Sequence, residues 1–112
     1  MSCIFCKIAN KEIASELLYE DDHIIAFHDI NPQAPVHVLL VSKKHVETLS
    51  SISDEDEDLA SRFILAAREI AKKHNIEESG FRFVINCNAD GGQEVYHLHA
   101  HVIGGRKLGS MS

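Results

Sequence analysis

His97-Leu98-His99-Ala100-His101 places a histidine at every second position, a few residues after the glycine pair Gly91-Gly92. Successive side chains of a β-strand point to opposite faces of the sheet, so this spacing puts all three imidazoles on one face. The intervening apolar residues then face a core. A glycine turn followed by a strand with ionisable groups on one side is typical of a strand that lines an active site.

The geometry of a strand limits what these three histidines can do together. At about 3.3 Å per residue, His97 and His101 start about 13 Å apart. One tetrahedral zinc ion, with nitrogen ligands at about 2.0–2.1 Å, can take a neighbouring pair but not all three. We therefore expect the histidines to divide the work, with at least one free of metal and able to act as a nucleophile or proton carrier near neutral pH. The alternative is a strand that carries histidines by chance.

Length and composition indicate one globular domain over residues 1–112. The chain is 45% hydrophobic and 25% charged, with no apolar run of the roughly 18 residues that a membrane span needs and no secretory leader. We therefore expect a cytoplasmic protein with no membrane partner. The net charge of −6 argues against nucleic acid as the main partner. A small anion in a local pocket remains compatible, because backbone N–H groups and histidines can bind it.

The order of predicted elements favours an α+β fold with a mostly antiparallel sheet. Ser53 and the acidic residues after it indicate a helix start, and apolar residues at helical spacing continue this helix to about His74. Alternating and β-branched stretches predict the strands. The expected elements are a short helix over 3–9, a long helix over 53–74, and strands over 16–20, 23–27, 36–42, 81–86 and 97–103, with loops over 29–35 and 87–93.

Three cysteines give an odd count that does not suit a disulfide framework. Cys3 and Cys6 have the spacing of half a zinc site or of a redox dithiol, but no strand precedes them as in redox dithiols. Zinc needs four donors, and histidines would have to complete the set. Spacing alone leaves zinc and inert reduced thiols as alternatives.

The loop before the histidine strand bears on the ligand. Residues 88–93, Asn-Ala-Asp-Gly-Gly-Gln, tolerate left-handed backbone conformations and can aim consecutive N–H groups at an anion. A plain Asp-Gly hairpin connection is the alternative. Asn86, before this loop, could offer an amide to a phosphate, and Asp29, in the loop bracketed by prolines, could accept sugar hydroxyls.

Two long segments carry a resemblance to a known family. Residues 91–106, GGQEVYHLHAHVIGGR, resemble the signature of the histidine-triad (HIT) family, and residues 27–37, FHDINPQAPVH, match a second characteristic segment. Ile4-Phe5 and Ser42-Lys43-Lys44-His45 extend the resemblance from near the N-terminus to about Met111. It is strongest to the branch of nucleotide-binding proteins that hydrolyse purine nucleoside phosphoramidates.

The resemblance implies a five-stranded antiparallel sheet with one long helix and a short N-terminal helix. It implies a homodimer in which two such sheets join into one of ten strands. It also implies that a purine nucleoside monophosphate or its phosphoramidate is the substrate, that the P–N bond is hydrolysed through a nucleotidyl-histidine, and that no organic cofactor takes part.

The resemblance also implies roles for individual residues. His99 is the nucleophile, His101 contacts the phosphate, and His37 supports both. The expected substrate-binding residues are Asp29 for the ribose, Ile30 for the base, and Asn86, Gly92, Gln93 and Glu94, with His99 and His101, for the phosphate. The expected ligands of a structural zinc are Cys3, Cys6, His45 and His97, as in relatives that carry the cysteine pair.

One departure concerns Glu94, because many relatives carry a serine there whose hydroxyl is a candidate proton donor to the leaving amine. The identity of the leaving-group acid, the physiological amine and the preference for adenine or guanine stay open. Two other functions also stay open: a nucleotide-binding or scaffolding module with vestigial activity, and a metal-dependent enzyme that uses two histidines of the strand.

Overall fold

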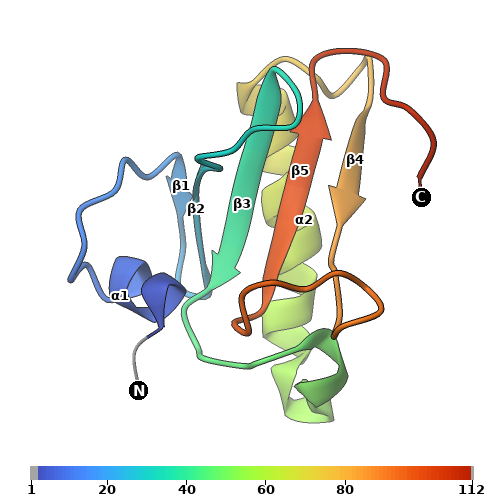
Figure 1. Cartoon of the computed structure of the whole chain (residues 1–112). Helices are drawn as coiled ribbons and strands as arrows, with labels where there is room; N and C mark the ends of the chain where they lie inside the picture. Colours follow the sequence, from blue (N-terminus) through green and yellow to red (C-terminus); the bar gives the residue numbers. More distant parts are fainter. Residues whose placement is uncertain (1–2, 112) are drawn as a thin grey trace.

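The computed structural model describes residues 3–111, which form one five-stranded antiparallel sheet with two helices. The strands are β1 (Tyr19–Glu20), β2 (Ile24–His28), β3 (Val36–Ser42), β4 (Phe81–Val84) and β5 (His99–Gly104), in the spatial order β1-β2-β3-β5-β4 (Figure 1). The predicted α+β fold is confirmed. β3 and β5 lie side by side in the middle, and β4 is an edge strand with one neighbour.

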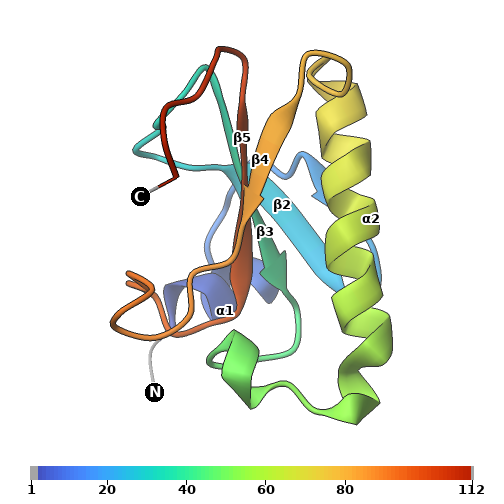
Figure 2. The same ribbon diagram turned by 90° about the vertical axis from the view of Figure 1, so that its right-hand side faces the viewer.

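The two helices cover opposite faces of the sheet, as Figure 2 shows. The long helix α2 (Glu57–Lys73) packs on one face, where its apolar stripe meets residues such as Leu40 and Val102. The short helix α1 (Ile4–Ala9) lies on the other, where Phe5 contacts a smaller apolar cluster that includes Val41. The alternation of β3 and β5 assigns their histidines to this second face, beside α1.

Several element boundaries differ from those that the sequence predicts. β1 has two residues in place of the five predicted over 16–20, and β4 ends at Val84 rather than at residue 86. β2 begins one residue later than predicted, because the Asp21 carboxylate accepts the N–H groups of His23 (2.7 Å) and Ile24 (2.8 Å) and closes a turn there. The short helix is confirmed, with Cys3 as its N-cap.

The prediction of a strand from residue 97 is wrong at its start, since β5 begins at His99. The ring Nε2–H of His97 donates to the carbonyl oxygen of Ser42 at 2.6 Å, just beyond the last pair of the β3–β5 ladder, Val41 and His99. His97 therefore occupies a bend, fully buried, while Leu98 N–H bonds to Val46 O at 2.7 Å.

The long helix is preceded by two short 3₁₀ turns, Leu49–Ser51 and Asp54–Asp56, so its regular part starts later than predicted. Asp56 fixes this start, because its carboxylate accepts the backbone N–H of Ser53 at 3.0 Å and the Lys44 ammonium at 2.8 Å. Within residues 3–111, no helix combines the length and the apolar character required to cross a bilayer.

Candidate functional site

His99 is held in one tautomer by the backbone. Its Nδ1 lies 2.6 Å from the carbonyl oxygen of His97, which can only accept a hydrogen bond, so Nδ1 carries the proton. The lone pair of a neutral His99 is therefore on Nε2. The imidazole is 8% exposed and lines a cavity of about 610 Å³ on the face of the sheet that α1 covers. Phe5 packs edge-on against it, with ring centroids 5.0 Å apart.

A hydrogen-bond chain fixes the protons on two further histidines. The backbone N–H of Gln33 donates to His37 Nδ1 at 3.0 Å, so a neutral His37 carries its proton on Nε2. That Nε2 lies 2.9 Å from His101 Nδ1 and 3.4 Å from a carboxylate oxygen of Asp29. His101 thus accepts on Nδ1 and has its own N–H on Nε2. The chain leaves His101 as a neutral donor in the cavity.

Burial keeps these imidazoles uncharged. It lowers the pKa of His101 to about 4, with the nearby His99 and His37 adding to the effect. Burial also lowers the pKa of His37, and the carboxylate of Asp29 only partly opposes this. Near neutral pH, His37 and His101 therefore contribute N–H dipoles to the cavity rather than imidazolium charges.

The cavity gathers most of the residues that the sequence singles out. Seven of the predicted catalytic and substrate-binding residues line it: Asp29, His37, Asn86, Gly92, Glu94, His99 and His101. Gln93 and Ile30 are not among its lining residues. The Gln93 amide is buried, donating to Glu47 O at 2.8 Å and Val95 O at 3.0 Å, and Ile30 is 93% exposed.

In the glycine loop (residues 88–93), two of the predicted phosphate donors are already bonded to carbonyl groups of the same loop. The N–H of Gly92 bonds to Ala89 O at 3.0 Å, and the N–H of Gln93 bonds to Asn88 O at 3.1 Å. Asn86 Nδ2 likewise donates to Gly91 O at 2.7 Å. These bonds rigidify the loop. Gly91 is required there, because an added Cβ would lie 2.5 Å from the carbonyl oxygen of Cys87.

Four other residues line the cavity without being predicted: Phe5, Asn31, Gln33 and Leu39. For Leu39 a signal exists in the sequence, since it follows His37 at the strand period of two. Phe5 depends on where α1 docks, which no local pattern specifies.

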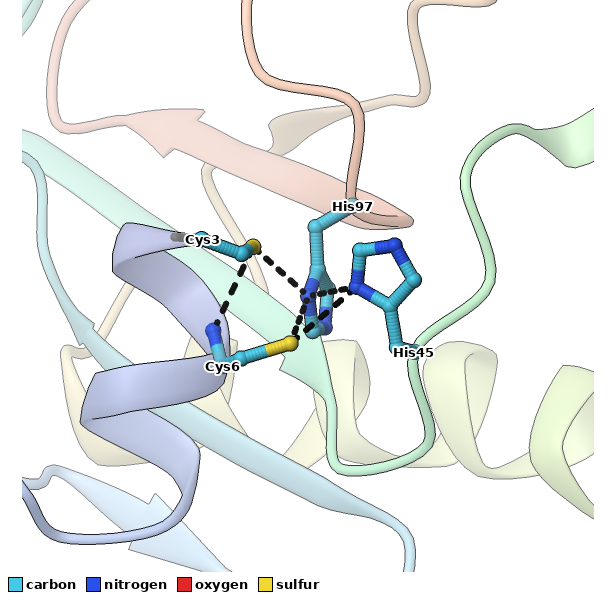
Figure 3. Close-up of side chains that lie close together, drawn as sticks. All are labelled: Cys3, Cys6, His45 and His97. Carbon is cyan, nitrogen blue, oxygen red and sulfur yellow. Dashed lines mark hydrogen bonds between the residues drawn. The ribbon is translucent and has the colours of Figure 1, made fainter. Parts of the chain in front are cut away.

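A second cluster joins the N-terminus to the start of β5. Figure 3 shows Cys3 and Cys6 from α1, His45 from the loop after β3, and His97 converging on one point. His97 Nδ1 lies 3.4 Å from each sulfur and 3.2 Å from His45 Nδ1, and Cys6 Sγ lies 3.1 Å from His45 Nδ1. The structure thus brings together all four predicted metal ligands, with donor atoms within 4.8 Å of one another.

The donor set fits a tetrahedral zinc ion. Zn–S bonds of about 2.3 Å and Zn–N bonds of about 2.0–2.1 Å separate tetrahedral donors by roughly 3.3–3.8 Å, close to the observed spacings. The tautomer of His97 also fits, because its Nε2–H is bonded to Ser42 O and the lone pair of Nδ1 faces the sulfurs. Burial lowers the pKa of His97, which favours the neutral form that a metal requires.

Asp29, His37 and His101 also bring three donor atoms together, but their protonation does not suit a metal. His37 would coordinate through Nε2, and that nitrogen carries the proton as long as Gln33 N–H occupies Nδ1. The group is better described as a hydrogen-bond relay that orients His101.

Comparisons with known proteins agree on one family. Residues 10–108 match the model of the HIT domain. The purine nucleoside phosphoramidase of Escherichia coli (strain K12) is 46% identical over 108 residues, which cover 96% of this chain and 91% of that protein. A histidine triad protein from Clostridium difficile has a TM-score of 0.95 at 49% identity, over 100% of this chain and 97% of the other. A Zn-bound histidine triad family protein from Mycobacterium smegmatis has a TM-score of 0.84 at 27% identity, over 100% and 81% of the two chains.

The depressed pKa of His101 predicts that acid destabilises the fold. In the unfolded chain this imidazole takes up a proton near its ordinary pKa of 6.5, whereas in the native protein it does so only near pH 4. Between these values the unfolded state binds more protons, so its free energy falls relative to the native state as pH decreases. We expect the free energy of unfolding, measured by urea denaturation, to decline from pH 6.5 to pH 4. The decline should be shallower for His101→Asn; equal slopes in the two proteins would contradict the assignment.

Proposed function

The chain belongs to the HIT domain family, and from this premise we propose that it is a nucleotide hydrolase that cleaves the P–N bond of purine nucleoside phosphoramidates. The observation that carries the proposal is the hydrogen bond from His99 Nδ1 to His97 O, because it places the lone pair of the neutral ring on Nε2, in a cavity with room for a nucleotide. The phosphoramidase name of the Escherichia coli relative supports the same substrate class.

The proposed reaction has two displacements at phosphorus. His99 Nε2 attacks the α-phosphorus, the P–N bond breaks, and the nitrogen leaves with the bonding electron pair and takes up a proton from water. Water then attacks the nucleotidyl-histidine, the N–P bond to His99 breaks, and a proton returns to solvent. The sum is phosphoramidate plus water giving the nucleoside monophosphate and the amine. The covalent intermediate divides one difficult displacement into two easier ones.

His101 and the relay behind it stabilise the phosphorus centre. The Nε2–H of His101 donates to a phosphate oxygen, and His37 holds this tautomer through its bond to Nδ1. Asp29 retains one carboxylate oxygen for the ribose, since its Oδ1 accepts the N–H of Asn31 at 2.7 Å. Ile30, next to Asp29 and largely exposed, flanks the base.

On the loop side we assign the phosphate to the second N–H of the Asn86 amide and to the backbone N–H of Glu94. Gly92 has its N–H bonded to Ala89 O, so its role is to let the phosphate approach the backbone closely. The buried Gln93 amide stabilises the loop by donating to Glu47 O and Val95 O, so Gln93 affects phosphate binding indirectly, by holding the loop in position.

We propose that Cys3, Cys6, His45 and His97 hold a structural zinc ion. With four protein ligands the metal has no open position for water, so it supplies stability by joining α1 to the start of β5. The Zn-bound relative supports this assignment, as does the Nδ1 lone pair of His97.

We further propose a homodimer that forms along β4. This strand is at the sheet edge, so a second copy could continue the ladder into ten strands. Beside it lies an apolar hollow of about 180 Å³ between the strand and α2, whose lining includes Phe83, Ile85 and Ile64, the last being 66% exposed. Within residues 3–111 none of the three cysteines forms a disulfide, which suits the reducing cytoplasm, where we place the protein.

Replacing the nucleophile tests the function directly. His99→Asn should reduce hydrolysis of an adenosine phosphoramidate with a fluorescent amine by about a thousandfold or more while AMP still binds. Mass spectrometry of the wild type during turnover should detect an adduct of one AMP. His28→Asn is the control and should keep wild-type turnover, because the His28 ring does not line the cavity and packs against His74, on the side of the sheet that α2 covers. Wild-type rates in His99→Asn would contradict the proposal, and AMP binding without turnover by the wild type would favour a vestigial binding module.

Removing one thiol tests the zinc site. Cys6→Ser should weaken zinc binding more than about tenfold and lower the melting temperature, because three ligands cannot close the tetrahedron. Cys87→Ser is the matched control, since Cys87 lies outside the cluster, and it should retain about one zinc ion per chain. Elemental analysis and thermal unfolding measure both effects. Equal zinc content in the two variants would exclude the assignment.

The dimer can be tested with a charge on the apolar hollow. Ile64→Glu should raise the dimer dissociation constant at least about tenfold, because the carboxylate would be desolvated at the interface. Ile13→Glu, at a partly exposed isoleucine outside this hollow, should leave it unchanged. Sedimentation velocity distinguishes the outcomes, and a monomeric wild type would refute the proposal.

A further inference from the structure

The catalytic cavity is lined by acidic and neutral groups. Asp29 and Glu94 carry its carboxylates, and none of the described residues that line it is a lysine or arginine. His37 and His101, whose pKa values are lowered, are neutral near pH 7. A cavity with this lining must nevertheless admit a phosphorus centre that is itself anionic. Positive charge elsewhere in the substrate would offset this repulsion.

The two carboxylates differ in the number of hydrogen bonds and ion pairs that they make within the protein. Asp29 accepts the N–H of Asn31 at 2.7 Å and lies 3.4 Å from the His37 ring nitrogen. Glu94 is exposed, and within residues 3–111 its carboxylate makes no hydrogen bond or ion pair. Both oxygens of this carboxylate are therefore available to bind a cationic group in the cavity.

The polar groups around Glu94 differ from its side chain in type. His101 offers an N–H donor through its tautomer, which suits phosphate oxygens. Asn86 uses one N–H of its amide on Gly91 O and keeps the second as a donor. The Glu94 side chain, when ionised, can only accept. A substituent of the leaving group that reaches the Glu94 side chain would therefore meet a carboxylate, which favours an ammonium group.

We propose that Glu94 selects phosphoramidates whose leaving amine carries a second, positively charged amino group, such as diamines and lysine-like amines, over amines that carry a carboxylate. This inference rests on the proposed function and adds the chemical class of the leaving group to it. The Glu94 carboxylate forms an ion pair with the distal ammonium, and the same carboxylate repels an anionic substituent.

The test compares three adenosine 5′-phosphoramidates of matched length, made from 1,4-diaminobutane, butylamine and 4-aminobutanoate. The quantity measured is the ratio of kcat/KM for the cationic substrate to that for the anionic one. The intrinsic reactivity of each P–N bond is the same for wild type and Glu94→Gln, so it cancels when the two ratios are compared. We expect Glu94→Gln to lower the ratio about three- to tenfold, and added salt to lower the wild-type ratio toward the variant's.

Asp90→Asn is the matched control, because Asp90 lies on the same loop but does not line the cavity. It should keep the wild-type ratio. An unchanged ratio in Glu94→Gln, or an equal loss on all three substrates, would overturn the selective role of Glu94. If the wild type hydrolyses none of the three, the proposed function itself fails, which is a different result from hydrolysis without charge preference.

Discussion

His97 is the residue through which the two halves of the site are connected. Its ring Nε2–H is bonded to Ser42 O, its Nδ1 lies among the donors of the Cys/His cluster, and its carbonyl accepts the Nδ1–H of His99. One buried residue therefore joins α1, the end of β3 and the His99 imidazole. Phe5, which lies between the two thiols in sequence, adds to this connection, with its ring packed edge-on against both His97 and His99. The position of the proposed nucleophile thus depends on the docking of the N-terminal helix.

Backbone groups, rather than charged side chains, set the tautomers of the imidazoles. A carbonyl can only accept and an amide N–H can only donate, so each of these bonds leaves one tautomer available. Ser42 O and His97 O fix two of the rings, and Gln33 N–H fixes His37 and through it His101. Because these backbone groups cannot titrate, the pattern of donors and acceptors holds for as long as the rings stay neutral.

The sequence was sufficient for the parts of this arrangement that depend on periodicity. The period of two places His99 and His101 on one face of β5, and the same period in β3 adds His37, since the two strands pair with Leu39 opposite His101. Strand geometry also predicts that one metal ion cannot hold all three histidines. The assignment of His97 to the Cys/His cluster comes from the resemblance to the HIT family, and His97 reaches this cluster by leaving the strand.

The remaining features depend on contacts between segments distant in sequence, which local patterns do not encode. The docking of α1 brings Phe5 to His99, and Gln33 N–H reaches His37 from a loop that has no periodic signal. The glycine loop was expected to turn its N–H groups outward, but Gly92 and Gln93 bond to carbonyls of the same loop. Residue type predicts that this loop binds a ligand, but it does not specify which of the loop's N–H groups are already bonded within the loop.

These details explain how a protein with a net charge of −6 can have a site suited to a phosphate. A cluster of lysines or arginines would bind the anion by Coulomb attraction, in the ground state and the transition state alike. In the proposed mechanism the donor is the neutral imidazole N–H of His101, held in place by a hydrogen-bond chain that begins at the backbone of Gln33. Such a fixed dipole costs little reorganisation when charge develops on the phosphate oxygens, because its orientation is set before the substrate arrives. Burial, which lowers the pKa of His101, is therefore compatible with catalysis, since it keeps the relay in its working tautomer.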